Sequence, residues 1–331
     1  MTLASTEGPL VASFDALWLD LDGVVYRSAD PIDSAIEVLR DLSMPQAFLT
    51  NNANRTAEAV AAHLRDIGLD HVRTRDVVTA AQAIATLMAD DLPAGAPVMV
   101  VGGPGLREAV ADAGLTPVGY DHGAPAAVVQ GYAPELGWSD LAEASYAINA
   151  GARWYVSNPD LSIPTARGTA PGNGALAQAV RYATGVDPVV AGKPHRPLFD
   201  ATAERLGSSA PLMVGDRLDT DIAGAAAAGI ASLFVLTGVN SVDDVLAATG
   251  SERPHHVAPD LRAVHEVHAS VTIARASATC GDATATLDTD TATISVTGGT
   301  ALERLRAVVA LGWTHHDASG TAARFDGMIE P

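Results

Sequence analysis

Two aspartates that stand two positions apart near the start of the chain could share one polar site. Asp20 and Asp22 follow the apolar run Ala16–Leu19 and precede a glycine. A divalent cation would neutralise their repulsion, because hard cations prefer carboxylate oxygens. The first carboxylate could attack a phosphorus atom, and the second could protonate the leaving oxygen and then activate water. An acidic turn that merely closes a strand is the alternative for this motif alone.

The segment Thr50-Asn51-Asn52 offers hydrogen-bond donors after a second apolar stretch. It ends the run QAFLT, which we expect to be a strand over Gln46–Thr50. Hydroxyl and amide groups at a strand end can donate hydrogen bonds to phosphate oxygens. The competing interpretation is a polar cap for a helix that begins near Thr56.

Lys193, in the segment Ala191-Gly192-Lys193-Pro194, is the single lysine among 20 basic residues. The chain uses arginine wherever an ordinary surface cation is enough. A compact ammonium fits between a carboxylate and a phosphate, whereas a planar guanidinium needs more room. We therefore expect Lys193 to neutralise charge in a phosphate site, with a chance surface lysine as the alternative.

A fourth polar motif, GDRLDTD, follows the expected strand Pro211–Val214. Asp216 comes directly after a strand-ending glycine, where it is well placed as a metal ligand. Asp221 lies near the start of the next helix, which suits a supporting role behind the metal ligands or an interaction with the helix dipole. Asp219 is expected to face solvent. The alternative is an acidic loop that caps this helix, but a coincidence of four structural caps explains the whole set poorly.

Alternating strands and helices would position these motifs. The apolar periodicity predicts strands at 16–21, 46–50, 97–101, 126–130, 153–156, 211–214 and 232–236, and helices at 31–42, 56–68, 105–114, 139–150, 173–184, 220–228 and 242–248. Such alternation indicates a mostly parallel sheet with helices on both faces, and ligands bind such sheets at the carboxyl ends of the strands.

The order of these elements predicts an α/β fold with three parts. A Rossmann-like parallel-sheet core would comprise residues 11–80 and 188–268, and an inserted α/β cap domain residues 81–187. Residues 269–331 would form a small α+β accessory module. Alternating apolar residues near Val271 and Ile294 predict short strands in it, and helical spacing predicts a helix over 300–311.

Charge narrows the range of partners. The formal net charge of −19 over 331 residues repels phosphate backbones and anionic lipid, so we expect neither nucleic acid nor a membrane as partner. A phosphate site in this chain must supply its own positive charge locally. The sequence leaves a homo-oligomer open.

The single cysteine, Cys280, excludes an internal disulfide and favours a reducing compartment, which we take to be the cytoplasm. The first residues lack the pattern of a signal peptide. The charge-free stretch 222–242 is interrupted by glycines, so we expect a helix followed by a strand and not a membrane span.

Together the four motifs resemble those of the haloacid dehalogenase superfamily. Asp20-x-Asp22-Gly23 is similar to its first motif, Thr50-Asn51-Asn52 to its second, Lys193 to its third and Gly215–Asp221 to its fourth. The residues of the four motifs, and the long insertion between the second and third motifs, resemble those of the class IIA capped phosphatases. The resemblance covers about residues 14–268.

The resemblance implies a role for each motif. Asp20 would be the nucleophile that forms an aspartyl-phosphate, and Asp22 the acid and base. Mg²⁺ would be held by Asp20, by Asp216 and by the backbone carbonyl of Asp22. Thr50 and Asn51 would hold the phosphoryl oxygens, and Lys193 would neutralise charge on Asp20 and the phosphate. In the cap, the candidates for meeting the substrate are Asn158, Asp160, Ile163 and Arg167, and the segment Pro171–Gly174 also matches the branch.

The branch includes phosphatases of pyridoxal phosphate, phosphoglycolate, glycerol 3-phosphate and sugar phosphates. The whole length of the chain is similar to the actinobacterial glycerol-3-phosphate phosphatases, so a small phosphorylated metabolite, first of all glycerol 3-phosphate, is the expected substrate. The pyridoxal branch carries a histidine where this chain has Ile163, which counts against pyridoxal phosphate. The tail of the actinobacterial enzymes has been likened to an acetyltransferase fragment. Residues 269–331 lack the glycine loop that would bind coenzyme A, so we expect no acetyl transfer.

A catalytically silent regulatory protein that binds a phosphometabolite is the alternative from another class, and the intact carboxylate set argues against it. Several other signals are given no function. The glycine-rich stretch 101–105 is expected to be a turn, the pairs His255-His256 and His315-His316 solvated loop residues, and Cys280 without catalytic duty.

Overall fold

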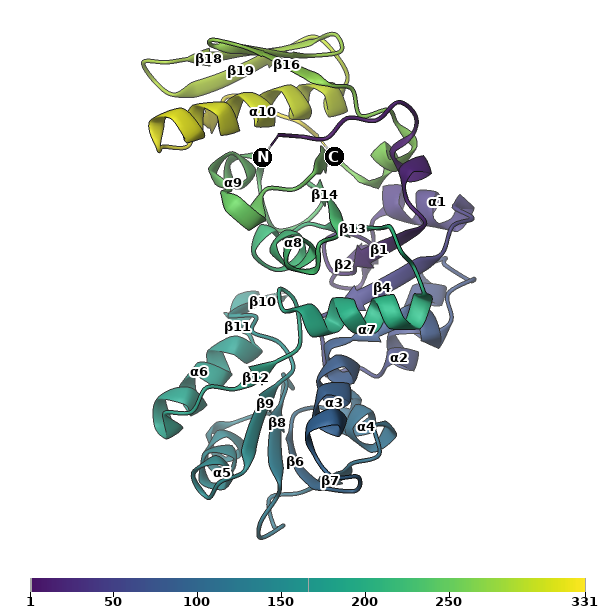
Figure 1. The fold of residues 1–331 in the computed structure, drawn as a ribbon, viewed down its shortest axis with the longest axis vertical. Coiled ribbons are helices and arrows are strands. Elements are labelled where there is room, and N and C mark those ends of the chain that lie inside the picture. The colour runs from purple at the N-terminus through teal and green to yellow at the C-terminus, as the bar shows by residue number, and fades with distance from the viewer. Residues whose placement is uncertain (1, 166, 331) are drawn as a thin grey trace. The chain divides into compact units, whose positions relative to one another are not determined.

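The computed structural model describes residues 2–165 and 167–330 (Figure 1). The chain divides into two compact units, one formed by the residues up to Gln46 with those from Ser208 onward, the other by Ala47–Gly207. The domain boundaries expected from the sequence, at 80/81, 187/188 and 268/269, stay a prediction. Among the described residues, no helix combines the length and apolar character needed to cross a membrane.

A parallel sheet forms the centre of the first unit, with strands in the order β15–β14–β13–β1. Its strands are β1 (Ala16–Asp20), β13 (Pro211–Gly215), β14 (Ala231–Val235) and β15 (His256–Ala258). The register pairs Leu19 with Val214 and Val214 with Leu233, and all three side chains are buried. Strands buried on both faces read as continuous apolar runs, which is why the sequence marks them well. The predicted α/β class with a parallel sheet is confirmed.

Helices and short turns connect these strands. They are the 3₁₀ helices η1 (Leu10–Ser13), η4 (Gly250–Glu252) and η5 (Leu261–His265), the π-helical turn η3 (Leu218–Ile222), the helices α1 (Asp33–Asp41), α8 (Ala223–Ala228) and α9 (Val242–Ala247), and the small hairpin of β2 (Tyr26–Arg27) and β3 (Asp30–Pro31). The turn η3 arises because the backbone N–H groups of Asp221 and Ile222 both donate to the Arg217 carbonyl, at 3.1 and 3.2 Å. The helix expected over 220–228 therefore begins with a wider turn.

The end of the chain forms a second sheet covered by a long helix. The strands are β16 (Val271–Ala274), β17 (Ser277–Cys280), β18 (Ala283–Asp288), β19 (Thr293–Thr297) and β20 (Arg324–Phe325). The first pairs are antiparallel, and β20 joins β19 in parallel. Helix α10 (Ala301–Ser319) lies along one face of this sheet (Figure 1). Thr300 caps its start by accepting from the Glu303 N–H.

This C-terminal part shares its apolar core with the parallel-sheet part of the same unit. Ile294, Leu305 and Val308 belong to one buried cluster with Phe234 and Leu246. The indole of Trp313 donates to the Val245 carbonyl at 2.7 Å. Arg253 stacks over the Trp313 ring, 5.1 Å from its centre, and pairs with Asp317 at 2.7 Å. Helix α10 is thus sandwiched between its own sheet and helix α9.

The second unit contains a parallel sheet in the order β12–β9–β8–β6–β7 and the parallel pair β4–β5. The strands are β4 (Gln46–Thr50), β5 (Val77–Thr79), β6 (Pro97–Val101), β7 (Thr116–Val118), β8 (Ala127–Gln130), β9 (Arg153–Val156) and β12 (Val189–Val190), with the antiparallel hairpin β10 (Ser162–Thr165) and β11 (Gly168–Pro171). The helices are α2 (Ala57–Asp66), α3 (Ala80–Asp91), α4 (Pro104–Asp112), α5 (Trp138–Asn149), α6 (Asn173–Thr184) and α7 (Arg196–Leu206), with the 3₁₀ turn η2 (Thr74–Asp76).

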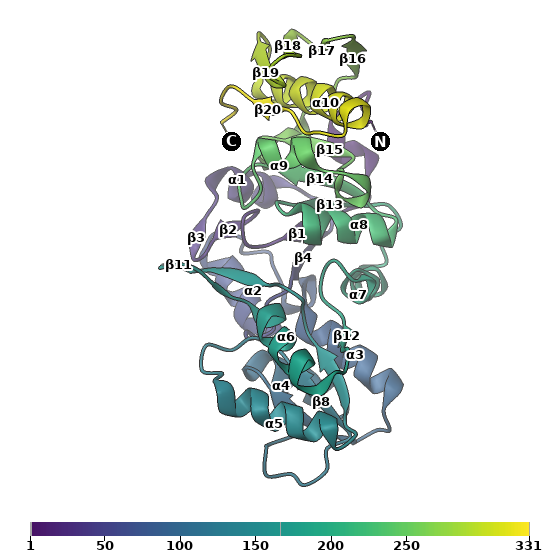
Figure 2. The ribbon, with the colours of Figure 1, turned by 90° about the vertical axis from the view of Figure 1, so that its left-hand side faces the viewer.

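Helices α5 and α6 lie side by side on one face of this sheet (Figure 2), where Ile148 and Val180 pack against Trp154. The cap of α2 is Thr56, whose hydroxyl accepts from the Ala59 N–H at 3.1 Å. The segment Thr50-Asn51-Asn52 is therefore not the cap of that helix.

Some expectations about the elements were wrong. The helix expected over 300–311 continues to Ser319 because Trp313 still packs inward, and it ends where Gly320 adopts a positive φ. His315 and His316 consequently lie on a helix and not in a loop. Helices α3 and α7 were not anticipated from the sequence.

The pair His255-His256 is also not a solvated loop. His256 lies in β15, is buried, and its ring meets Phe14 and His268 edge to face. The Nε2 of His268 is 3.1 Å from the Ala263 carbonyl, and its Nδ1 faces the Arg306 guanidinium at 3.3 Å. Burial and the Arg306 charge lower the pKa of His268 to about 4. Burial, then the charges of His268 and Arg306, lower the pKa of His256 to about 3.

These two neutral imidazoles predict a stability that depends on pH. Their folded pKa values lie below the unfolded value, so the unfolded chain binds more protons and stability is lost as pH falls below about 6.5 toward about 4. We expect the free energy of unfolding to fall by about 1 kcal/mol or more per pH unit between pH 6 and 5, measured by urea unfolding. His268→Gln should make this slope shallower, whereas His122→Gln on the surface should not. An equal slope in both variants would contradict the assignment.

Candidate active site

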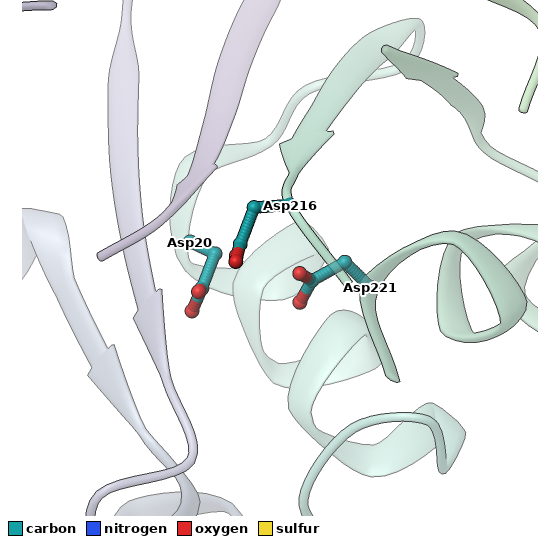
Figure 3. Close-up of side chains that lie close together, drawn as sticks. All are labelled: Asp20, Asp216 and Asp221. Atoms are coloured by element: carbon teal, nitrogen blue, oxygen red, sulfur yellow. The ribbon is translucent and has the colours of Figure 1, made fainter. Parts of the chain in front are cut away.

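Neighbouring parallel strands place two of the predicted aspartates together. Asp20 is the last residue of β1, and Asp216 directly follows β13, the strand that pairs with β1. Because parallel strands end at the same edge of a sheet, both side chains emerge at the carboxyl edge. Asp221 reaches the same place from the turn η3 (Figure 3).

The three carboxylates form one cluster. One oxygen from each of Asp20, Asp216 and Asp221 can be chosen so that all three lie within 4.8 Å of one another. Asp216 and Asp221 are buried, and Asp20 is partly exposed. Asp221, for which the sequence predicted a supporting role behind the metal ligands or an interaction with the helix dipole, has its carboxylate beside those of Asp20 and Asp216.

Close backbone contacts fix the orientation of Asp216. A Cβ on Gly238 would lie 1.9 Å from Asp216 Oδ2, and one on Gly23 would lie 2.4 Å from the same atom. Gly23 also has a φ of +96°, which a residue with a side chain rarely adopts. The Val239 N–H donates to Asp216 Oδ2 at 2.6 Å. These contacts were not visible in the sequence, where only Gly23 belongs to a recognisable motif.

Asp221 is held in a similar way. The Arg217 N–H donates to Asp221 Oδ2 at 3.1 Å, and a Cβ on Gly215 would lie 2.2 Å from the Asp221 Cβ. Asp219 points away and forms an exposed ion pair with Arg217 at 2.8 Å, as expected for a solvated residue.

The donor set fits a hard divalent cation. Carboxylate oxygens are the ligands that Mg²⁺ and Ca²⁺ prefer, and a dication offsets the repulsion that three neighbouring carboxylates exert on one another. Zinc and copper sites would instead show cysteine or histidine ligands, and none belongs to this cluster.

Asp22 lies on the loop that leaves β1. Its carboxylate accepts from the Ser28 N–H at 3.1 Å, and its side chain is exposed. The Thr237 hydroxyl donates to the Gly23 carbonyl at 2.6 Å and anchors this loop. The carboxylate of Asp22 is not a member of the cluster, which is compatible with a role in proton transfer and with cation binding through its backbone carbonyl.

The residues predicted to hold phosphate lie in the second unit and are joined by hydrogen bonds. Thr50 Oγ1 accepts from the Asn52 N–H at 3.0 Å, so its hydroxyl proton can still donate. Asn52 accepts from the Asn54 N–H at 2.9 Å. The side chain of Asn51 bonds to the backbone of Lys193 at both ends of its amide. What Asn51 can offer a phosphate is therefore its backbone N–H and not its side chain.

The four cap candidates separate into two groups. Asn158 and Asp160 join the hydrogen bonds around Asn51. Ile163 and Arg167 lie on the hairpin of β10 and β11, where Ile163 is half-buried and Arg167 is exposed. Asn173, which stands in the matching segment Pro171–Gly174, also belongs to the first group, because its side-chain Nδ2 donates to the Asn158 carbonyl at 2.9 Å.

Comparison with known proteins agrees with this architecture. A haloacid dehalogenase-like hydrolase family model matches residues 17–116, and a second hydrolase model of the same kind matches residues 190–264. These segments contain the carboxylates of β1, the Thr50–Asn52 segment, Lys193 and the acidic turn after β13.

Two curated relatives are similar over most of the chain. The D-glycerol 3-phosphate phosphatase of Mycobacterium tuberculosis is 47% identical over 260 residues, which cover 78% of this chain and 73% of that protein. The acid sugar phosphatase of Staphylococcus aureus is 38% identical over 237 residues, covering 70% of this chain and 90% of that protein.

Solved structures extend the likeness to the C-terminal part. The crystal structure of a glycerol phosphate phosphatase from M. tuberculosis with magnesium has a TM-score of 0.83 at 39% identity, and covers 98% of this chain and 95% of its own. The p-nitrophenyl phosphatase from Archaeoglobus fulgidus has a TM-score of 0.68 at 29% identity, and covers 76% of this chain and 98% of its own. The identities, coverage and family models agree, and the chain belongs to the haloacid dehalogenase-like hydrolases.

Proposed function

We propose that the chain hydrolyses small phosphomonoesters through a covalent aspartyl-phosphate on Asp20. The convergence of Asp20, Asp216 and Asp221 at the ends of neighbouring parallel strands carries this proposal. It places a nucleophilic carboxylate among the ligands for a dication, which phosphoryl transfer requires. The phosphatase names of the similar proteins support the same reaction.

Magnesium is the cation that these carboxylates would hold. Asp20, Asp216 and the backbone carbonyl of Asp22 are the proposed ligands, and Asp221 supports them from within the cluster. When bound, the ion supplies positive charge that offsets the charge of the phosphoryl oxygens and of the carboxylates. The magnesium in the M. tuberculosis crystal structure supports this choice.

The chain's own residues perform the two transfers. A carboxylate oxygen of Asp20 attacks phosphorus, and the bond between phosphorus and the substrate's ester oxygen breaks as the bond to Asp20 forms. Asp22 gives its proton to the departing alcohol oxygen. Asp22 then takes a proton from a water that attacks the same phosphorus, which releases inorganic phosphate and regenerates the Asp20 carboxylate.

Lys193 and the Thr50–Asn52 segment are proposed to hold the phosphoryl oxygens. The Thr50 hydroxyl, the backbone N–H of Asn51 and the side-chain amide of Asn52 would donate to them, and the Lys193 ammonium would balance their charge. Lys193 is only 2% exposed. A charge in so little solvent interacts more strongly with an anion than a surface charge does.

Glycerol 3-phosphate is the first choice of substrate. The relative with 47% identity is named for it, and the magnesium-containing structure that matches almost the whole chain is a glycerol phosphate phosphatase. A sugar phosphate is the second choice, because relatives with 38% identity are named acid sugar phosphatases. Phosphoglycolate and pyridoxal phosphate remain lesser alternatives.

The setting of the enzyme is part of the same proposal. The single cysteine favours a reducing cytoplasm. The acidic net charge favours a small phosphorylated metabolite over nucleic acid or membrane as partner. A homo-oligomer is left open.

A panel of phosphomonoesters tests the function directly. We expect phosphate release to be fastest with glycerol 3-phosphate, to stop with a chelator and to return with added Mg²⁺. The panel includes a hexose phosphate, phosphoglycolate and pyridoxal phosphate. Faster release from a hexose phosphate would favour the second choice. Binding of these metabolites without any turnover would instead favour the regulatory alternative.

Asp20→Asn should abolish turnover, because an amide oxygen is a far poorer nucleophile than a carboxylate. We expect a loss of at least about 10³-fold in kcat, with thermal unfolding close to that of the unchanged protein. Asp219→Asn, which alters an exposed acid of the same region, is the matched control and should stay active. Retained activity in Asp20→Asn would refute the covalent mechanism.

Lys193→Arg should lower activity although it keeps the charge. The side chain is buried, and a planar guanidinium does not fit a site built for a compact ammonium. We expect kcat/KM to fall by about tenfold or more, as measured on the best substrate of the panel. Arg196→Lys, an exposed exchange three residues further along the chain, should leave the rate unchanged. A normal rate in Lys193→Arg would show that the position only needs charge.

A further inference from the structure

The loop of residues 157–160 is held by buried amide side chains. Asn158 is 2% exposed, and its Nδ2 donates to the Asn51 carbonyl at 2.7 Å. Its Oδ1 accepts from the Asp160 N–H at 3.2 Å. Both ends of this amide are therefore engaged with protein. These bonds favour a structural role for the Asn158 side chain.

Asn51, which accepts the hydrogen bond from Asn158, is itself hydrogen-bonded to Lys193. The Lys193 N–H donates to Asn51 Oδ1 at 2.8 Å, and Asn51 Nδ2 donates to the Lys193 carbonyl at 3.0 Å and to Asp160 Oδ1 at 3.0 Å. The two hydrogen bonds to Lys193 fix the backbone on both sides of its Cα. Because the ammonium sits at the end of a flexible four-carbon stem, the place of that Cα decides where it can reach.

The first turn of helix α6 is hydrogen-bonded to the loop of residues 157–160. Asn173 is 1% exposed, and its Nδ2 donates to the Asn158 carbonyl at 2.9 Å. The Gly174 N–H donates to the Asp160 carbonyl at 2.8 Å. A Cβ on Gly174 would lie 2.0 Å from the Pro159 carbonyl oxygen, and one on Gly172 would lie 2.3 Å from that of Asp160. The residue types of the segment Pro171–Gly174 are thus explained by its contacts. The two glycines let its backbone lie close to the loop of residues 157–160, and Asn173 makes the hydrogen bond to Asn158.

We propose that Asn173 is a positioning residue for Lys193. It holds Asn158, which holds Asn51, which holds the Lys193 backbone on both sides, so the start of α6 fixes the base of the single lysine. We call the three asparagines, together with Lys193, the asparagine network. The inference rests on the proposed function for its catalytic consequence. Its structural part, the link from Asn173 to the Lys193 amide, stands apart from any activity.

The first test measures hydrogen exchange of the Lys193 amide by NMR under native conditions. Asn173→Ala should speed this exchange at least fivefold, because the amide loses a fixed acceptor when Asn51 moves. Gln178→Ala, an exposed amide on the same helix, is the matched control and should leave the rate unchanged. An unchanged Lys193 exchange rate in a folded Asn173→Ala protein would overturn the proposal.

The second test is kinetic and uses a double-mutant cycle. In the otherwise unchanged enzyme, Asn173→Ala should lower kcat by about tenfold, because misplaced catalytic groups lose much of their effect. In a Lys193→Ala background the same change should cost less than about twofold, since nothing is left to position. Equal losses in both backgrounds would show that Asn173 serves the fold alone and would overturn the proposal.

The two tests keep the separate claims distinguishable. If the unchanged protein releases no phosphate from any substrate, the proposed function fails, but the exchange measurement still decides whether Asn173 holds Lys193. Asn173→Ala leaves the Asn158 carbonyl without its donor, which costs stability. Should that variant not fold, Asn173→Ser replaces it. Its side chain is too short for the bond to Asn158, and the same changes in exchange and in the kinetic cycle are expected.

Discussion

Three carboxylates held next to one another repel, and much of the first unit is arranged to tolerate that repulsion. Asp20 and Asp216 are brought together by the register of β1 with β13, and Asp221 by the wide turn η3. Gly23 and Gly238 let the backbone close on Asp216, and N–H groups of Val239 and Arg217 meet the buried acids. A dication bound there would offset the remaining repulsion, so the arrangement is suited to holding one.

Charge-neutral groups hold the residues proposed to meet phosphate. Apart from Asp160, the side chains around Asn51 that make these bonds are amides. An amide can fix a loop through a donor and an acceptor without adding charge. A carboxylate at the place of Asn51 would add negative charge beside the residues proposed to meet phosphate. The network therefore secures the backbone of Lys193 without adding charge of its own.

The sequence predicted what depends on local pattern and missed what depends on distant contact. Buried parallel strands such as Ala16–Asp20 read as apolar runs, and the acids after them mark the edge of the sheet. The π turn that begins at Leu218 was not predicted, because it depends on the Asp221 and Ile222 N–H groups sharing the Arg217 carbonyl. The proposed role of Asn173 could not be predicted from the sequence. Its side chain bonds to the Asn158 carbonyl, fifteen residues away, and the Asn158 side chain bonds to Asn51, which directly follows β4. His256 was misplaced because its ring packs against Phe14, which lies far away in the sequence, and against His268.

The shared core around α10 has a consequence for any shortened form of the chain. Side chains of Phe234 and Leu246 reach into the same apolar cluster as those of Leu305 and Val308. Cutting the chain after residue 268 would therefore leave apolar side chains of the parallel-sheet part uncovered, and an exposed patch of that kind favours aggregation.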